Sequence, residues 1–222
     1  VDVNHDIVGN DDLDAERSHN INTALAYRHA KDKGVYTSEV SLFYNTISDL
    51  IMLAQTSATR YSYVNIGHYR TVGGSLGAGW DNGHWVISCG TSVTGRYDDV
   101  AASSGSPYLF NSEVRASVTK QWLRKGWSGS AFWKWQDRLP NYAVLADGTV
   151  SRSFVSAFHM ADASLTKRIW KERLAITGGC KNLFNVTNLS GAISGGAHSG
   201  GTTSIPMSTG RLAFLRIELD LK

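Results

Sequence analysis

The connections between the apolar segments of this chain alternate between very short and long, and this alternation constrains the fold more than any other feature. The short connections are Lys31–Gly34, Asp81–Gly83, Leu123–Gly126 and Lys171–Glu172. The long connections are residues 1–19, 46–66, 97–107, 138–154 and 185–208. An up-and-down transmembrane barrel has tight turns on one rim and long loops on the other. The pattern therefore predicts an all-β chain of about ten antiparallel strands in such a barrel.

The final segment alternates apolar and polar residues with a period of two, which indicates a strand with two different faces. One face would carry Ala213, Leu215, Ile217, Leu219 and Leu221. The other would carry Arg216, Glu218, Asp220 and Lys222. The same alternation runs through 20–30, 35–45, 69–80, 84–96, 113–122, 155–170 and 172–183. Such strands meet hydrocarbon on one side and water on the other. Residues 126–137 are ambiguous, because Phe132 lies opposite Trp127, Ala131, Trp133 and Trp135.

Composition limits the alternatives. The chain has 222 residues and is 42% hydrophobic. No apolar run approaches the roughly 20 residues of a membrane helix. The net charge is +3 and the basic residues do not cluster, so nothing indicates a nucleic-acid partner. Cys89 and Cys180 fall on outward positions of different strands, and we predict no disulfide between them.

Five tryptophans flank the short connections, namely Trp80, Trp85, Trp122, Trp127 and Trp170. Tryptophan rings prefer the boundary between membrane and water, so these positions predict an aromatic girdle at the periplasmic rim. The alternative is that they cap the core of a soluble protein, but soluble sheets use shorter strands, usually of about five or six residues.

Six segments, in order, resemble those of TonB-dependent outer-membrane receptors. The most specific is Lys181–Asn182–Leu183–Phe184–Asn185, which is similar to the strand end that shortly precedes the last strand in that family. The other five are Glu16–Ile21, Val40–Ile51, Tyr63–Gly73, Tyr142 with Asp147–Gly148, and Asp162–Ser164. The glycine-rich loop around His198, followed by Gly210–Arg211, most resembles receptors of the Bacteroidetes type.

The resemblance implies that residues 1–222 are the C-terminal part of a larger barrel of roughly 22 strands. The N-terminal strands and the plug domain that fills such a barrel are absent from the sequence. The remaining wall would belong to the same polypeptide or to a separate chain, because an open sheet edge is costly in lipid. Closure as a small barrel is the alternative. The end at Leu221–Lys222 departs from the aromatic terminus of many outer-membrane barrels.

The resemblance also implies a function: TonB-dependent active uptake of a scarce, bulky nutrient such as an iron chelate, haem or cobalamin. The implied partners are the plug, the TonB complex acting through it, a possible surface lid lipoprotein, and lipid of the bacterial outer membrane. No cofactor, metal site or catalytic set is expected. The alternatives are a passive porin, a soluble β-sandwich adhesin, and an outer-membrane enzyme, for which the sequence offers no convergent acid, base or nucleophile.

Two groups of residues are candidates for binding. The outer loops offer His198, Arg96, Tyr97, Tyr61 and Tyr63 as contacts to the substrate. The lumen near the periplasmic rim offers Arg168, Arg173, Arg216, Glu218 and Asp220 as contacts to the plug. Simpler interpretations are a loop in which the histidine is incidental, tyrosines that pack at the rim, and charges that line a wet interior.

Overall fold

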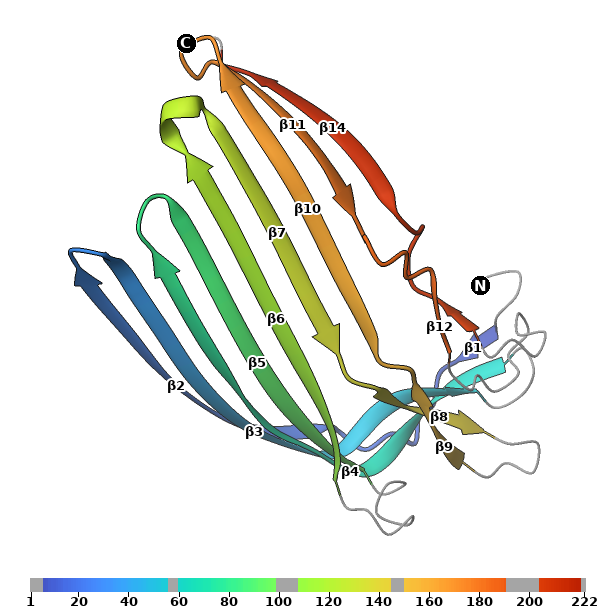
Figure 1. Cartoon of the computed structure of the whole chain (residues 1–222). Coiled ribbons are helices and arrows are strands. Elements are labelled where there is room, and N and C mark those ends of the chain that lie inside the picture. The colour runs from blue at the N-terminus through green and yellow to red at the C-terminus, as the bar shows by residue number, and fades with distance from the viewer. Residues whose placement is uncertain (1–5, 56–59, 99–107, 145–149, 191–203, 221–222) are drawn as a thin grey trace.

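The computed structural model describes residues 6–55, 60–98, 108–144, 150–190 and 204–220 of an all-β chain. One antiparallel sheet dominates (Figure 1). In spatial order its strands are β2 (Arg17–Lys31), β3 (Gly34–Gln55), β4 (Arg60–Asp81), β5 (Trp85–Asp98), β6 (Leu109–Trp122), β7 (Trp127–Gln136), β10 (Phe158–Ile169), β11 (Leu174–Lys181) and β14 (Leu212–Leu219). A short strand, β1 (Asp6–Val8), pairs parallel with β4. This arrangement confirms the predicted antiparallel sheet of about ten strands.

All four predicted short connections join neighbouring strands at one rim, which is the upper rim in Figure 1. Between β4 and β5, the Asn82 side chain accepts hydrogen bonds from the backbone of His84 and Trp85 at 3.0 and 2.7 Å. Between β6 and β7, the helix η1 (Leu123–Lys125) ends at Gly126, whose φ of 60° is left-handed. Among the described residues, no helix combines the length and apolar character needed to cross a membrane.

Three of the predicted long loops contain more strand than expected. Residues 46–66 are mostly paired, because β3 and β4 continue beyond the rest of the sheet to the pair Gln55 and Tyr61. Both segments are rich in aliphatic and aromatic residues, which favour strands. The range 138–154 contains the hairpin of β8 (Leu139–Val144) and β9 (Val150–Val155). The range 185–208 contains β12 (Asn188–Ser190) paired with β13 (Ser204–Pro206).

The strand register separates the side chains into two faces, because residues directly opposite each other point to the same side. We call one the polar face, and it carries Arg28, Glu39, Ser41, Ser88, Arg115, Ser130, Asp162, Thr166, Arg216 and Glu218. We call the other the apolar face, and it carries Leu25, Leu42, Leu76, Ile87, Val93, Val118, Ala131, Leu165, Leu215 and Ile217. The alternation seen in the sequence is therefore realised over most of the sheet, with exceptions such as Arg70, which lies opposite Tyr97 on the apolar face.

The register also resolves the ambiguous segment. Phe132 lies opposite Ser117 and Asp162 and so belongs to the polar face. Trp133 lies opposite Ala116 and Ala161, on the apolar face.

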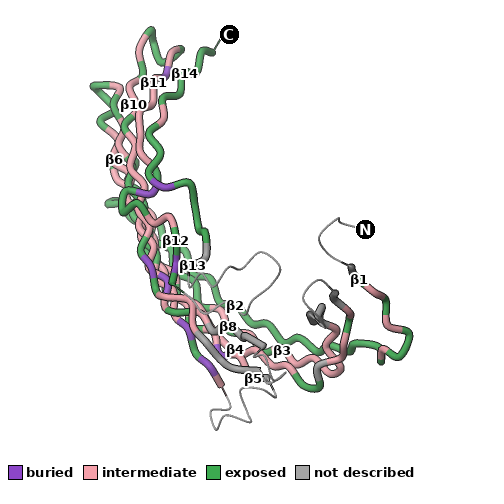
Figure 2. The backbone as a smooth tube through the Cα atoms, turned by 90° about the vertical axis from the view of Figure 1, so that its right-hand side faces the viewer, coloured by how far each residue is buried: buried purple, intermediate pink, exposed green. Residues whose placement is uncertain are grey.

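The sheet is a curved wall with two free edges (Figures 1 and 2). Every residue of β2, the first edge strand, is exposed. At the opposite edge, Leu215 is 70% exposed and Ile217 is 64% exposed. Among the described residues, neither β2 nor β14 has a second neighbour in the sheet. Large aliphatic side chains are thus displayed rather than packed into a core.

Candidate functional site

Pairs of hydroxyl side chains cross the polar face from strand to strand. Ser41 and Ser75, Ser88 and Ser117, and Ser130 and Ser164 are each joined at 2.8 Å. Thr166 and Thr177 are joined at the same distance. Each pair sits directly opposite in the register, so the hydroxyls satisfy one another and still have spare lone pairs. Because these side chains are short and polar, this part of the face rises little above the backbone and can be hydrated.

A hollow of about 630 Å³ lies over the middle strands, between Arg28 and Glu39 on one side and Arg115 and Phe132 on the other. Its floor is made by glycines of β4. A Cβ atom added at Gly77 would meet nothing within 4 Å, so the space above this residue is open. The polar face therefore has a groove whose walls carry both positive and negative charge.

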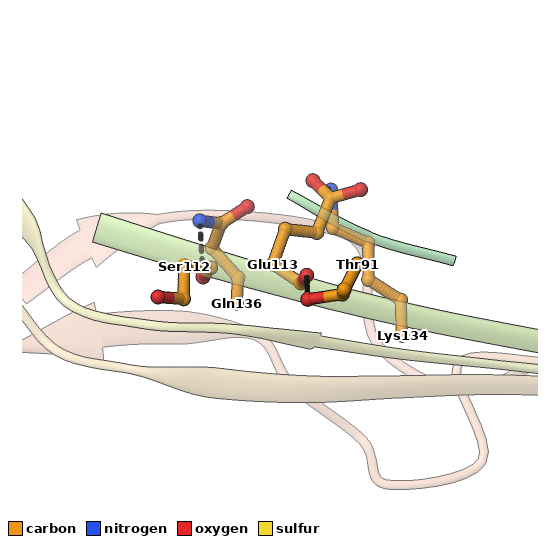
Figure 3. A network of polar contacts seen from close by, with 5 residues as sticks. All are labelled: Thr91, Ser112, Glu113, Lys134 and Gln136. Carbon is orange, nitrogen blue, oxygen red and sulfur yellow. Dashed lines mark hydrogen bonds and ion pairs between the residues drawn. The ribbon is translucent and has the colours of Figure 1, made fainter. Parts of the chain in front are cut away.

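An ion pair closes the loop end of this face (Figure 3). Lys134 Nζ lies 2.7 Å from Glu113 Oε2, joining β7 to β6. Beside them, Gln136 is 7% exposed and donates to the Ser112 carbonyl at 3.3 Å. These contacts join β6 to β7 on the polar face, while the Lys134 and Glu113 side chains remain 30% and 25% exposed.

A second hollow, of about 270 Å³, lies near the last strands and is lined by Phe132, Phe214, Asp162 and Lys181. Lys181 Nζ stands 5.9 Å from the centre of the Phe214 ring. Phe214 lies directly opposite Gly179, which leaves room for the ring against the sheet. Phe132 and Phe214, both on the polar face, were not predicted as site residues.

The structure separates the residues predicted to contact a substrate. Arg96 is on the polar face, where its Nη1 donates to Asn111 Oδ1 at 2.9 Å. Tyr97, the next residue, points to the opposite face and packs against Tyr108 with ring centres 5.7 Å apart. Tyr63 is 40% exposed and pairs with Leu53 in the β3–β4 extension. Tyr61 pairs there through its backbone with Gln55. His198 lies outside the described residues.

The residues predicted to contact a plug lie near the short-turn rim. Arg168 borders a hollow of about 240 Å³ at the β6–β7 turn. Arg216 and Glu218 form an ion pair with each other, although their side chains remain 68% and 49% exposed. The Asp220 backbone donates to the Arg173 carbonyl at 2.8 Å. Arg168, Arg216 and Glu218 share the polar face, as predicted.

Sequence reasoning assigned no role to the asparagines that hold the loop bases. Asn65 donates from its side chain to the carbonyls of Asp49 and Asp14, at 2.6 and 3.1 Å. Its Oδ1 accepts from the Asp14 backbone at 2.8 Å. The carboxylate of Glu16 accepts from the Ile51 backbone at 3.1 Å. This first loop base ties residues 14–16 to the β3–β4 extension.

The second loop base is centred on Asn182, which is 3% exposed. Its Nδ2 donates to the Val186 carbonyl at 2.9 Å and to Ser208 Oγ at 2.8 Å. Its Oδ1 accepts from the Val186 backbone at 2.9 Å, and its own backbone donates to Asp162 Oδ1 at 2.8 Å. Asn185 Oδ1 accepts from the Arg211 backbone at 2.9 Å. The signal in the sequence was the pair of asparagines in the motif at 181–185.

The apolar face has an aromatic belt at each end. Near the short turns, Trp85 and Trp122 flank Lys120, and Trp127 flanks Lys167. Near the loops lie Tyr97, Tyr108 and Phe110, and further along Trp133, His159 and Phe184. At about 3.3 Å per residue, Trp85 and Tyr97 are separated by about 40 Å along β5. With a tilt of about 40°, this gives about 30 Å along the barrel axis, close to the thickness of a hydrocarbon core.

These features define a class of protein: the wall of a transmembrane β-barrel, with a wet polar face and a lipid-compatible apolar face. No group of three or more His, Cys, Asp and Glu side chains in the described part of the chain is arranged to hold a metal ion. Residues 2–183 match the family described as TonB dependent receptor-like, beta-barrel. The chain belongs to this family, which consists of outer-membrane receptors and transporters rather than enzymes.

Solved structures of low sequence identity share the fold. The FrpB iron transporter of Neisseria meningitidis (F3-3 variant) has a TM-score of 0.67 at 18% identity, over 96% of this chain and 32% of its own. The copper transporter OprC has a TM-score of 0.68 at 18% identity, over 94% of this chain and 32% of its own. The ferripyoverdine receptor of Pseudomonas aeruginosa has a TM-score of 0.62 at 11% identity, over 93% of this chain and 27% of its own. The chain thus spans about a third of their length. A search of curated proteins gave no match.

Proposed function

We propose that the chain is the C-terminal part of a receptor that takes up a scarce, bulky nutrient across the bacterial outer membrane, driven by TonB. The observation that carries this proposal is a family match over residues 2–183 on a wall with one wet and one lipid-compatible face. A plug domain and further strands, in the same polypeptide or another chain, would complete the receptor. The two free edges of the sheet support this, since bare backbone groups are costly in lipid.

The proposed substrate is an iron chelate, haem or cobalamin. The names of the similar structures include iron, copper and ferripyoverdine carriers, which favours a metal complex. The low surface of hydroxyls and glycines around the groove of about 630 Å³ would leave room for a bulky solute beside a plug. The charges at Arg28, Glu39 and Arg115 would keep that route hydrated. A lid lipoprotein over the loops remains a prediction, as does a Bacteroidetes-type origin.

Uptake in paired strains tests the proposal. Cells that lack the receptor gene are complemented with the full-length polypeptide and supplied with labelled ferric chelates, haem or cobalamin. One of these should accumulate, and accumulation should be lost when TonB is deleted, because a plugged barrel needs energy from the inner membrane. Accumulation that is equal with and without TonB would contradict the proposal and indicate a passive porin.

Conductance provides an independent check on the porin alternative. The purified full-length receptor in a planar bilayer should pass little current, because its plug would block the lumen. Steady single-channel conductance would contradict a plugged barrel. The β-sandwich alternative has less support, since the described strands form one main sheet whose apolar side chains are exposed rather than packed against a second sheet.

A further inference from the structure

Two lysines on the apolar face stand out by their position. In the described residues of β5, β6, β7, β10, β11 and β14, this face carries only two Lys, Arg, Asp or Glu side chains, namely Lys120 and Lys167. Both lie toward the short-turn rim, inside the belt of tryptophans. A charge that faces lipid is costly, by about 2–4 kcal/mol at the midplane and less near the interface. Two such charges within one belt therefore suggest a negatively charged partner.

Aromatic rings hold both ammonium groups against the wall. Lys120 Nζ lies 4.3 Å from the Trp85 ring centre and 5.2 Å from the Trp122 ring centre. Lys167 Nζ lies 5.0 Å from the Trp127 ring centre and donates to the Lys125 carbonyl at 2.6 Å. A ring face attracts a cation but supplies only a weak acceptor, and each ammonium has three donors. Among the described residues, Lys120 Nζ has no hydrogen-bond or ion-pair partner.

The two lysines are close enough to act on one lipid head group. Lys120 lies opposite Gly129, which lies opposite Leu165, and Lys167 is the next residue on this face of β10. Two strand spacings separate their backbones, or about 10 Å across the sheet, and each side chain can lean toward the other. The Trp122 ring and Leu165 lie over Gly129, but Gly178, on the other side of Leu165, leaves the wall low. An acyl chain can lie in this depression below a head group at the lysines.

We infer that Lys120 and Lys167, with Trp85, Trp122 and Trp127, form a binding site for the phosphate head group of an anionic phospholipid in the leaflet at the short-turn rim. The phosphate oxygens would accept hydrogen bonds from the ammonium groups of the two lysines. The tryptophans would hold the glycerol region at the interface. In the orientation proposed above, that leaflet is the periplasmic one. The inference needs the apolar face to touch lipid but does not depend on the transported substrate.

Quenching of tryptophan emission tests the site. The full-length receptor is reconstituted in phosphatidylcholine vesicles that contain phosphatidylglycerol, with bromine on the acyl chains of one lipid or the other. We expect brominated phosphatidylglycerol to quench more per mole than brominated phosphatidylcholine. In the double variant Lys120→Gln with Lys167→Gln, this preference should fall, by about fivefold for each lysine. The pair Lys120→Arg with Lys167→Arg should retain it.

Lys181→Gln is the matched control, because it removes a lysine from the polar face, where Lys181 stands over Phe214. Its tryptophan emission should show the same preference for quenching by phosphatidylglycerol as the wild type. Heat-dependent gel mobility verifies that each variant is folded. Equal quenching by the two lipids in the wild type, or a preference that survives in the glutamine pair, would overturn the inference. Quenching by neither lipid would overturn it together with the proposed membrane orientation, whereas failure of TonB-dependent uptake alone would leave it standing.

Discussion

At the scale of single residues, the structure shows how Asn182 and Asn185 of the motif at 181–185 stabilise the start of a loop. Asn182 and Asn185 both have positive φ, at 52° and 55°, which asparagine tolerates better than most residues. Their side chains satisfy backbone groups that leave the sheet where β11 ends. The loop that follows therefore begins from a fixed base rather than from a frayed strand. Asn65 acts in the same way for the β3–β4 extension.

Replacing Asn182 by alanine should loosen the second loop base. The substitution removes three side-chain hydrogen bonds and leaves the Val186 N–H without its partner. We expect a local loss of stability of about 2–3 kcal/mol. Hydrogen exchange in residues 183–190 and 204–211 should accelerate while β5 and β6 keep their protection. Asn188→Ala is the control, since the Asn188 side chain makes only one bond, of 3.2 Å to Thr187 among the described residues. Unchanged exchange in Asn182→Ala would refute this role.

What could be predicted from the sequence depended on how far apart along the chain the interacting residues lie. Period-two alternation is local, so the faces of Leu215 and Arg216 could be read directly from the sequence. The bond between Asn182 and Ser208 joins residues 26 apart, and that between Asn65 and Asp14 joins residues 51 apart. No local pattern reveals such partners. Arg96 and Tyr97 were both predicted as contacts to a substrate, and the register places their side chains on opposite faces because adjacent strand residues alternate.

At the scale of the strand, β4 shows how one element serves two environments. Leu76 is 55% exposed on the apolar face, while Gly77 opens onto the groove of the polar face. β4 is long because it continues to pair with β3 beyond the other strands of the sheet. This extension lies in residues 46–66, which the sequence predicted to be a loop. In the partner strand β3, the aliphatic run at 50–54 lacks the period-two alternation from which the other strands were predicted.

A lysine placed at adjacent positions of β4 should have opposite consequences. Leu76→Lys puts a charge into hydrocarbon near the middle of the apolar face, at a cost of about 2–4 kcal/mol. Gly77→Lys puts the same charge on the wet face, at a position where an added Cβ atom meets nothing within 4 Å. Unfolding in urea from lipid vesicles should show a lower stability for Leu76→Lys alone. A larger loss in Gly77→Lys would reverse our assignment of the faces.

At the scale of the whole molecule, the free edges dominate. The backbone of β2 and of β14 presents unpaired N–H and C=O groups along one side, within the described residues. We therefore expect residues 1–222 alone to fail to insert as a heat-resistant barrel, and expect insertion when the upstream strands are supplied in the same or a second polypeptide. Electrophoresis with and without heating measures this. Insertion of residues 1–222 alone as a closed channel would contradict the proposal of a larger barrel.

The fixed loop bases have a consequence for how such a receptor changes over time. Surface loops vary more in sequence than the strands that they connect, and they tolerate insertions and deletions. Asn65 and Asn182 satisfy backbone groups at the bases of two such loops. Substitutions and insertions beyond these loop bases should therefore accumulate without disturbing the sheet.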